Sequence, residues 1–463
     1  MKKENVFIVF TILVIACVVV FFIAYSVTQR KRDSSVERLM AKAVAVQEKR
    51  SKPHLPETSV PQPEQKQDKA PAIVETETDN AEEDTIAAFT QFTWKMDAVE
   101  VDPKWKEALE LVPGWDKWTD EEQAKVAAFL DANRELISEI RRIADAGGPF
   151  IELDYSKGYA MELSHLAKLR TFARLLAADA VVASARGDYG ETVQDLDAIM
   201  KLANAVGEEP IFFSQLVRVA ITGILYANVS QTIPVENLSP EQVAQLLQIT
   251  ADAGGRNGFA NSFSGEGLMG LETFDDIRSG ELMRTGEPSV SIDDFFMQFY
   301  GSILARPFLY MDQEAYADIM ERMTDAMERP FYEAKPEMDR LTNEIENLPR
   351  TRVISRILLP ALTRAAETQA QNEAQLGLMR LGLAVELYHD QIGEYPQTLE
   401  DVAPTVGGEI PLDPFTGMPF VYEPRGDRFT LYSAMGSVID FNDRDLPSYV
   451  DSRGNIVWRG QSE

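Results

Sequence analysis

One uncharged run near the N-terminus limits what this chain can fold into more than any other feature. Residues Val6 to Ser26 read VFIVFTILVIACVVVFFIAYS, which is 21 consecutive residues without a charged side chain. A helix rises about 1.5 Å per residue, so this run can cross a hydrocarbon layer about 30 Å thick. Two lysines precede it and a basic cluster follows at 30–32. The sequence therefore predicts a short tail at 1–5 and a single transmembrane helix at 6–29.

Two other readings of the run stay open. Val14-Ile15-Ala16-Cys17 loosely fits a lipoprotein cleavage site, but nine more uncharged residues follow Cys17, where a mature lipoprotein usually turns polar. A cleaved secretory signal needs small residues before the cut, and no such site precedes the basic cluster. Cys17 is also the only cysteine, so the chain can form no internal disulfide and no cysteine-rich zinc site.

The net charge of −29 excludes one broad class of function. Residues 1–50 hold nine Lys or Arg and four Asp or Glu, which gives +5, so the remaining residues carry −34. Phosphate backbones require clustered Lys and Arg, so we expect no nucleic-acid partner. The acidic remainder is typical of a soluble, self-repelling surface, and a cation-rich partner is the alternative.

The composition changes sharply after the predicted span. Residues 30–50 fit a charged helical stalk. Residues 51–84 contain five prolines and almost no large apolar residue, which predicts a disordered linker that would let the rest of the chain stand off the membrane. An all-helical domain is expected at 85–350, and a long helix with a small α+β head at 351–463. The predicted fold class is therefore mainly α, with an antiparallel sheet confined to the head.

Local signals place several helix ends. Thr119 followed by Glu122 fits a capping box, and Gly147-Gly148-Pro149 should stop the helix that follows. Pro240 after Ser239 fits a capped helix start. Prolines at 330 and 336 should bend or divide one later helix, and another at 360 should kink the next. Residues 254–288 are rich in glycine and are expected to be irregular.

The helical region shows no catalytic signature. Gly265-Glu266-Gly267-Leu268-Met269-Gly270 matches a dinucleotide-binding string, but no strand is predicted before it, and Glu266 would repel phosphate. His165 falls on a predicted helix, where a hydrogen-bonded structural role is expected. The carboxylates Glu152, Asp154 and Glu162 are ordinary candidates for a hydrolytic site. We therefore assign no catalytic and no cofactor-binding residue.

The most distinctive motifs lie near the C-terminus. An amphipathic helix ends in Gly393-Glu394-Tyr395-Pro396, a turn reads Leu412-Asp413-Pro414-Phe415-Thr416-Gly417-Met418-Pro419-Phe420, and strands are predicted at 420–423 and 428–433. Over about the last 90 residues, this order resembles the globular head of the major pseudopilin of type II secretion systems and, more broadly, of type IV pilin-like proteins. The resemblance implies a helix packed on a small antiparallel sheet.

The resemblance also implies a metal site. In that family an acidic loop can hold calcium, and the matching residues here are Asp440, Asn442, Asp443 and Asp445. Closely spaced oxygen ligands suit a hard cation such as Ca²⁺. Arg444 sits within the loop, and the segment is shorter than in the family, so a solvated acidic loop is the alternative.

The N-terminus departs from the pilin pattern. Pilins carry a processed glycine before an apolar helix with a glutamate at its fifth mature position, and Val6 to Ser26 holds no glutamate. Assembly into a pilus by the usual route is therefore not expected. The basic cluster at 30–32 favours a cytoplasmic location for the residues after the span, whereas the resemblance favours the outside, and we adopt the outside. The expected location is the bacterial inner membrane.

These observations favour a membrane-anchored envelope protein with a scaffold or protein-interaction role. The pilin-like head would contact a protein partner or a second copy of the chain, and no reaction would be catalysed. A narrower alternative is an accessory component of a type II secretion or pilus-like system. A second alternative is a membrane-tethered hydrolase of unknown substrate.

Overall fold

A computed structural model describes residues 29–41, 84–93, 119–251, 256–279, 306–437 and 450–458. The predicted transmembrane helix and linker lie outside the described residues, apart from the last residue of each. The predicted calcium loop, with Asp440, Asn442, Asp443 and Asp445, also lies outside them. Their structures therefore remain predictions.

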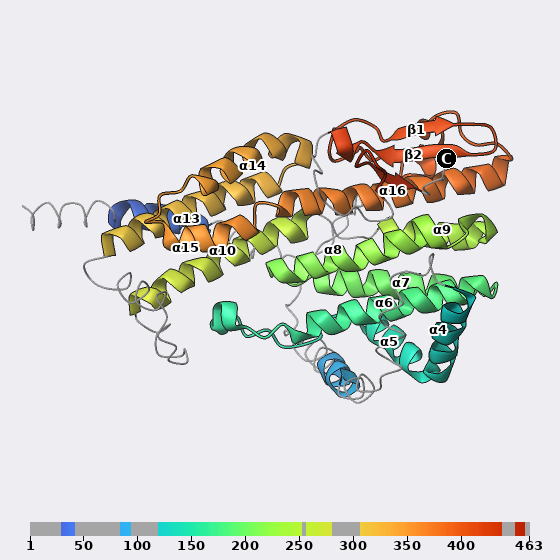
Figure 1. Cartoon of the computed structure of the whole chain (residues 1–463), viewed down its shortest axis with the longest axis horizontal. Helices are drawn as coiled ribbons and strands as arrows, with labels where there is room; N and C mark the ends of the chain where they lie inside the picture. Colours follow the sequence, from blue (N-terminus) through green and yellow to red (C-terminus); the bar gives the residue numbers. More distant parts are fainter. Residues whose placement is uncertain are drawn as a thin grey trace, which may run out of the picture.

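The described chain is mainly helical, with a small three-stranded antiparallel sheet near the C-terminus. The elements form an elongated stack (Figure 1). The sheet lies on α16, and α16 contacts α8 and α9 on its other side. Helix α7 packs between these helices and α6, and α4 and α5 cover the far side of the stack. Helices α10, α13, α14 and α15 form the end of the molecule away from the sheet.

The first helices begin and end where the local signals place them. The capping box is confirmed: Thr119 accepts from the backbone N–H of Glu122, and the Glu122 side chain accepts from that of Thr119. One difference is a break at Asn133, whose side-chain amide donates to the Phe129 carbonyl. Gly147 ends the second helix, as predicted. The two helices are α4 (Asp120–Ala132) and α5 (Arg134–Ala146).

A group of long helices forms the centre of the molecule. Two of them make an antiparallel hairpin in which Asp188 caps the second helix by accepting from Glu191 N–H. Ser239 and Gln242 cap a later helix reciprocally, which confirms the start predicted at Pro240. The elements are η2 (Tyr155–Ala160), α6 (Ser164–Ala185), α7 (Tyr189–Gly207), α8 (Phe212–Ala227), η3 (Asn228–Thr232), η4 (Val235–Asn237) and α9 (Pro240–Ala251).

The expectation of irregular structure at 254–288 is wrong over most of that range. Residues Arg256–Ser279 form one continuous helix, α10. Its glycines permit close approach to neighbouring elements. A Cβ atom at Gly265 would lie 2.5 Å from the Pro210 carbonyl oxygen, and one at Gly270 would lie 1.9 Å from the Tyr316 hydroxyl. The dinucleotide-like string therefore lies inside a helix and serves packing.

Pro330 and Pro360 divide the second half of the chain as predicted, whereas Pro336 lies inside a helix and does not divide it. One helix ends before Pro330, and the next begins directly after it. Pro360 lies in the short 3₁₀ turn that separates two further helices. The elements are α13 (Arg306–Met327), α14 (Phe331–Glu346), α15 (Val353–Leu358), η5 (Leu359–Ala361) and α16 (Ala365–Ile392).

The sheet has the strand order β1-β2-β3, with both pairs antiparallel. Two strands match the prediction, and the third was not predicted. In the register, Val421 faces Tyr432 and Leu431 faces Trp458. The elements are η6 (Leu399–Val406), β1 (Val421–Pro424), β2 (Phe429–Ser433), η7 (Met435–Ser437) and β3 (Ile456–Trp458).

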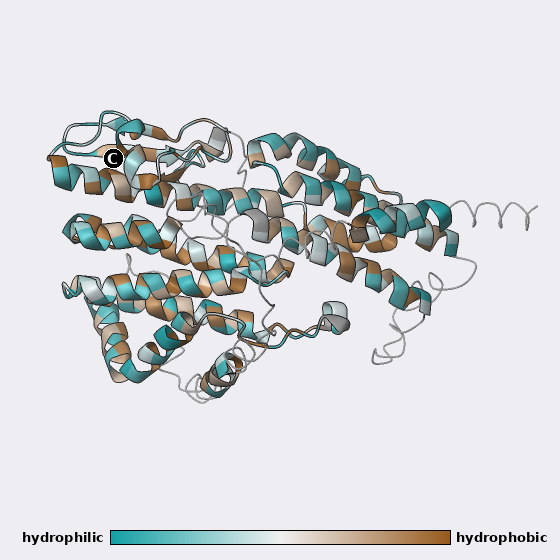
Figure 2. Cartoon of the chain, turned by 180° about the vertical axis from the view of Figure 1, so that it is seen from behind, coloured by the Kyte–Doolittle hydropathy of each residue, from teal (hydrophilic) through white to brown (hydrophobic). Residues whose placement is uncertain are grey.

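The sheet approaches α16 closely because two glycines face it. A Cβ atom at Gly377 would lie 2.8 Å from the ring of Phe420, and one at Gly382 would lie 2.2 Å from the ring of Trp458. The Tyr226 hydroxyl on α8 also donates to the Val457 carbonyl at 2.7 Å. Buried side chains from the sheet, α16 and the helices beneath it form one hydrophobic cluster. Hydrophobic and hydrophilic residues alternate along these helices, as expected of amphipathic elements (Figure 2).

Residues 29–41 are helical, and they do not stand apart from the body as an isolated stalk. Leu39 is fully buried, and its side chain contacts α10 at Gly267. The Arg38 guanidinium donates to Glu321 on α13 at 2.9 Å. The Arg32 guanidinium lies 4.8 Å from the centre of the Tyr310 ring. The described segment closest to the predicted span is therefore attached to the end of the molecule that lies away from the sheet.

The close contact at Gly270 leads to a stability prediction. Gly270→Ala should lower the free energy of unfolding by about 1–3 kcal/mol, because the added methyl group overlaps the buried Tyr316 side chain. The control is Gly223→Ala in α8, where the nearest atom would be 3.9 Å away. That change should stabilise the helix by about 0.5–1 kcal/mol. Denaturant unfolding measures both, and equal effects would contradict the packing role of Gly270.

Candidate functional site

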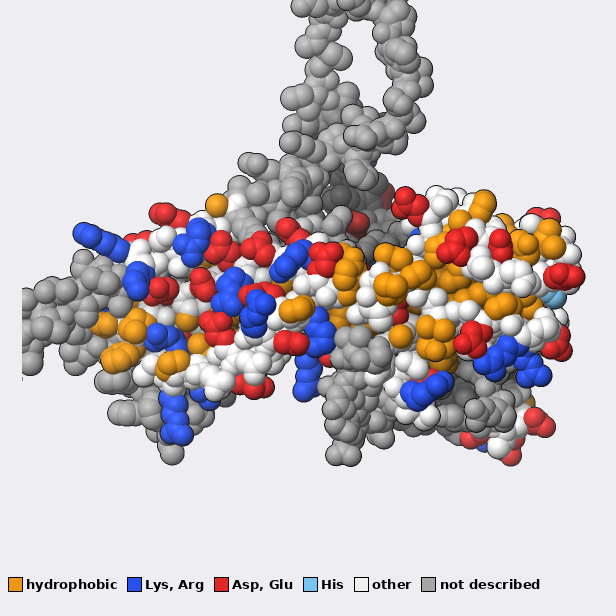
Figure 3. All heavy atoms as spheres, turned by 90° about the horizontal axis from the view of Figure 1, so that it is seen from above, with side chains coloured by type: hydrophobic (Ala, Val, Ile, Leu, Met, Phe, Trp, Pro, Cys, Tyr) orange, Lys and Arg blue, Asp and Glu red, His pale blue; other side chains and the backbone are white. Residues whose placement is uncertain are grey.

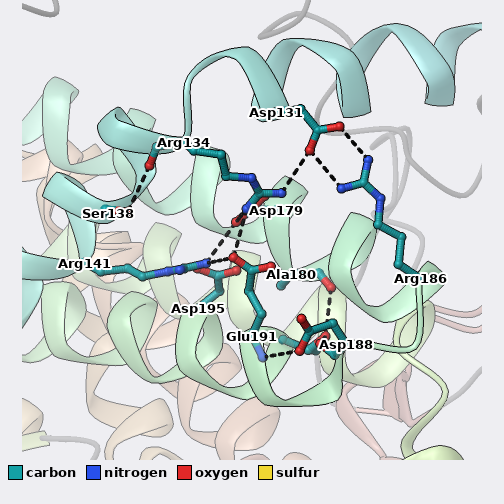
Figure 4. A network of polar contacts seen from close by, with 11 residues as sticks. Asp131, Arg134, Ser138, Arg141, Asp179, Ala180, Arg186, Asp188, Glu191 and Asp195 are labelled. Atoms are coloured by element: carbon teal, nitrogen blue, oxygen red, sulfur yellow. Dashed lines mark hydrogen bonds and ion pairs between the residues drawn. The ribbon is translucent and has the colours of Figure 1, made fainter.

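A network of ionisable side chains lies between α5, α6 and α7 (Figure 4). Five residues form it, and together they are called the buried charge cluster: Arg134, Arg141, Asp179, Glu191 and Asp195. Asp179 and Asp195 are fully buried, among the mostly apolar buried residues of α6 and α7. Burial of carboxylates is costly without cationic partners, and buried groups with altered ionisation often mark functional sites.

Two arginines from α5 supply those partners. Arg141 Nε donates to Asp195 at 2.6 Å, and its Nη2 donates to Asp179 at 2.9 Å and to Glu191 at 3.0 Å. Arg134 Nη1 donates to the same two oxygens of Asp179 and Glu191, at 2.8 and 2.9 Å. Each arginine therefore joins α5 to both helices of the α6–α7 hairpin.

An outer ion pair lies beside the buried charge cluster. Arg186 donates to both carboxylate oxygens of Asp131, each at 2.8 Å. The two hydrogen bonds from Arg186 lower the pKa of Asp131 to about 2. This pair is about half exposed, so it remains ionised across the physiological range and contributes little to stability.

The buried charge cluster holds one more carboxylate than guanidinium groups. Burial is the main cause that raises the pKa of Asp195 to about 8, and the nearby carboxylates of Asp179 and Glu191 act in the same direction. Burial also raises the pKa of Asp179. One oxygen of each aspartate has no hydrogen-bond partner in the described part of the chain. The cluster can therefore hold one proton near neutral pH, and its excess negative charge is reduced by that proton.

This proton leads to a prediction about pH. In the folded protein Asp195 keeps its proton up to about pH 8, whereas its ordinary pKa is 3.8. The folded state therefore binds more protons than the unfolded chain between these values, and the contribution of Asp195 to the free energy of unfolding falls as pH rises. Asp195→Asn should remove this part of the pH dependence, which denaturant unfolding at pH 5 and pH 8 measures.

Asp131→Asn is the matched control. Because the pKa of Asp131 is about 2, this residue does not titrate between pH 5 and pH 8. Its replacement should leave the slope of stability against pH unchanged. If Asp195→Asn and Asp131→Asn change the slope of the free energy of unfolding against pH equally, Asp195 does not hold the proton.

A second buried group contains Ser214, Glu209 and His165. Ser214 Oγ donates to one oxygen of the Glu209 carboxylate, and the other oxygen lies 2.9 Å from His165 Nε2. In a serine nucleophile site, the imidazole lies between the hydroxyl and the carboxylate. Here the carboxylate is in the middle, and Ser214 is fully buried. His165 therefore supports the junction between α6, the α7–α8 loop and α8, in agreement with the structural role expected of it.

A third feature is a buried arginine in α8. Arg218 is 1% exposed, and neither of its terminal nitrogens has a hydrogen-bond partner in the described part of the chain. Burial lowers the pKa of Arg218 to about 10, and Glu373 on α16 opposes this shift. Polar groups continue along the same helix pair, where Thr222 donates to Asn372. Arg218 is thus a buried cation whose desolvation is poorly compensated.

Arg218 and Arg141 lead to opposite predictions for the same substitution. Arg218→Met should raise the free energy of unfolding by about 1 kcal/mol or more, because it removes a desolvated charge and keeps the apolar stem. Arg141→Met should lower it by about 1–3 kcal/mol, because it leaves the Asp195 carboxyl group without its hydrogen-bond donor and Asp179 with Arg134 alone. Thermal and denaturant unfolding compare the two variants, and a shared sign would contradict the assignment of one unpaired and one paired arginine.

Sequence reasoning identified neither the buried charge cluster nor Arg218. Two signals pointed to the buried charge cluster: Asp179 interrupts the apolar run LLAADAVVASA, and Glu191 and Asp195 are spaced to lie on one helix face. The hydrolytic candidates Glu152, Asp154 and Glu162 are all exposed and are not brought together with them. The described residues contain no group of three or more His, Cys, Asp or Glu arranged to hold a metal ion.

The turn at 411–419, here called the head turn, has a rigid interior and an apolar exterior. The buried Asp413 carboxylate accepts from Phe415 N–H, the Ser433 hydroxyl and Ala434 N–H, which ties the turn to the end of β2. Burial raises the pKa of Asp413. Leu412 and Met418 point outward and are 50% and 64% exposed.

Helix α14 adds to this surface. The Tyr332 backbone N–H donates to the Pro414 carbonyl at 3.1 Å, so the start of α14 is joined to the head turn. The Tyr332 side chain is itself partly exposed beside Gly417. Seen from the sheet side, hydrophobic side chains gather over the half of this face nearer the sheet, and charged ones gather over the other half (Figure 3).

Comparison with protein-family models, with curated proteins and with solved structures finds no match for this chain. The resemblance to pilin-like heads therefore rests on the motifs themselves.

One described segment is apolar and long enough to cross a membrane. It is Phe212–Thr232, which covers α8 and η3. Half of its most apolar part is buried inside the structure, and it packs against α7 and α16. These contacts are typical of a core helix.

Proposed function

We propose that this chain is a single-pass, membrane-anchored envelope protein that acts as a scaffold and binds a protein partner through its pilin-like head. The transmembrane helix predicted from Val6 to Ser26 supplies the anchor, and the helical body carries the head. The head turn is the observation that supports the interaction role. It presents Leu412 and Met418 to solvent on a backbone that Asp413 fixes from inside.

The physical reason is preorganisation. Exposed apolar side chains gain free energy when a partner covers them. A turn already fixed by buried hydrogen bonds loses little conformational entropy on binding. Leu412, Met418 and Tyr332 meet both conditions, because the buried Asp413 holds the turn and the Tyr332 backbone holds α14 against it. A second copy of the chain is one possible partner.

A narrower form of the proposal makes the partner a component of a type II secretion or pilus-like system. The pilin-like order of helix, head turn and strands favours it. The two forms differ in what the head turn should contact, and crosslinking separates them.

The test places a photoreactive amino acid at position 418 of the full-length protein in its native membrane. The expected result is a discrete crosslinked product, which mass spectrometry identifies as a specific envelope protein or as the chain itself. Leu412→Glu should abolish this product, because a charge in the contact opposes burial. Secretion or pilus components in the product would support the narrower form.

The control position is Asp427, which is 93% exposed in the turn between β1 and β2 of the same head. A photoreactive residue there should give no equivalent product. Crosslinks of equal yield from both positions, or none from position 418, would reject the head turn as the contact surface.

A further inference from the structure

The region around α15 has a charge opposite to that of the whole chain. Residues 347–366 contain four arginines and no Asp or Glu, although the net charge of the protein is −29. The arginines are Arg350, Arg352, Arg356 and Arg364, and with Ile357 they are called the α15 surface. A basic stretch with an exposed apolar residue on an acidic protein points to an anionic partner.

Helix α15 is oriented by a buried carboxylate. Asp312 on α13 accepts from the backbone N–H groups of Ile354 and Ser355 at 2.8 and 3.2 Å. Ile354 and Ser355 are buried, so the opposite side of this short helix faces outward. Ile357, near the end of the helix, is 64% exposed, and Arg356 beside it is also exposed. The packing of α15 on α13 therefore fixes the direction in which the α15 surface points.

The arginines of the α15 surface lie close to several carboxylates but form an ion pair with none of those described. None of the four forms an ion pair with a carboxylate in the described part of the chain, although Arg356 donates to the Leu348 carbonyl at 2.7 Å. Lys335, Asp339 and Glu346 from α14 and Glu367 from α16 line a groove of about 640 Å³ together with Arg356 and Arg364. Asp339 is paired with Lys335 at 2.8 Å.

The α15 surface lies at the end of the molecule to which helix 29–41 is attached. Arg32 in that helix stacks on Tyr310, and Tyr310 lies two residues before Asp312 on α13. In Figure 1, helix 29–41 and α15 lie together at the end opposite the sheet. Residue 29 is the last residue of the predicted transmembrane helix. The chain would thus leave the membrane next to the α15 surface.

We propose that the α15 surface rests on the anionic phospholipid headgroups of the membrane that holds the chain, with Ile357 inserted between them. The arginines would be attracted to the lipid phosphates, whereas the acidic remainder of the body would be repelled. A basic patch joined to an apolar residue is a combination suited to a membrane interface. This inference rests on the membrane anchor of the proposed function and specifies how the body is oriented on it.

The test uses the full-length chain with Cys17→Ser, reconstituted in vesicles. An environment-sensitive fluorophore is attached at Ile357→Cys, and quenchers are placed on lipid chains near the headgroups. The matched control is Ile392→Cys, because Ile392 is 61% exposed at the other end of α16, beside the head. In vesicles containing phosphatidylglycerol, the label at 357 should be quenched, and the label at 392 should not.

The charge dependence is tested separately. Vesicles of phosphatidylcholine alone should give little quenching at 357, and about 1 M salt should reverse it, because the screening length then falls to about 3 Å. The charge is removed by replacing Arg350, Arg352, Arg356 and Arg364 with glutamine. Each replacement should lower the ratio of molecules with the α15 surface bound to lipid to those with it free by about fivefold. Equal quenching at 357 and 392 would overturn the proposal. Quenching at 357 that is the same with phosphatidylglycerol and with phosphatidylcholine alone would also overturn it.

Alkaline carbonate extraction of the same vesicles separates this inference from the anchor on which it rests. Retention of the protein without quenching at 357 rejects the α15 surface and keeps the anchor. Release of the protein by carbonate, with charge-dependent quenching at neutral pH, rejects the anchor and keeps the α15 surface. Release without quenching rejects both.

Discussion

The structure depends on how closely the sheet can approach α16. Gly377 and Gly382 leave room for the rings of Phe420 and Trp458, where any side chain would collide with them. With the sheet seated at that distance, the other side of α16 remains available for α8 and α9. One helix therefore belongs to two packing layers, and the head and the helical body share a hydrophobic core. The hydrogen bond from Tyr226 to the last strand joins the same layers.

The sequence predicted well the features that are determined locally. Caps, helix-ending glycines and dividing prolines act within a few residues, so Thr119, Pro240 and Pro330 could be interpreted without knowing the fold. It predicted poorly what depends on distant partners. The glycines of α10 suggested a loop, because the close contacts that they permit with Pro210 and Tyr316 are not visible in the sequence. The third strand was missed because a three-residue strand has little pattern of its own and is defined by pairing with β2.

The candidate sites show the same limit. The sequence marks Asp179 and Asp195 as unusual, but their pairing depends on two arginines that α5 brings to them, and no local pattern in α5 predicts that role. Arg218 looks like an ordinary surface residue in the sequence, but α7, α8 and α16 bury it. Two groups of arginines in the described structure have different surroundings. Arginines of the buried charge cluster hold helices together, whereas those around α15 form no ion pair with any carboxylate among the described residues.

The length of α16 has a mechanical consequence. This helix begins beside α15 and ends beside the head, and its 28 residues span about 42 Å at about 1.5 Å each. Because α8, α9 and α14 pack along it, it cannot bend freely. A body oriented with α15 toward a membrane would hold the head at a fixed distance above the lipid. The protein would then act as a rigid spacer that sets the distance from the membrane at which a partner binds.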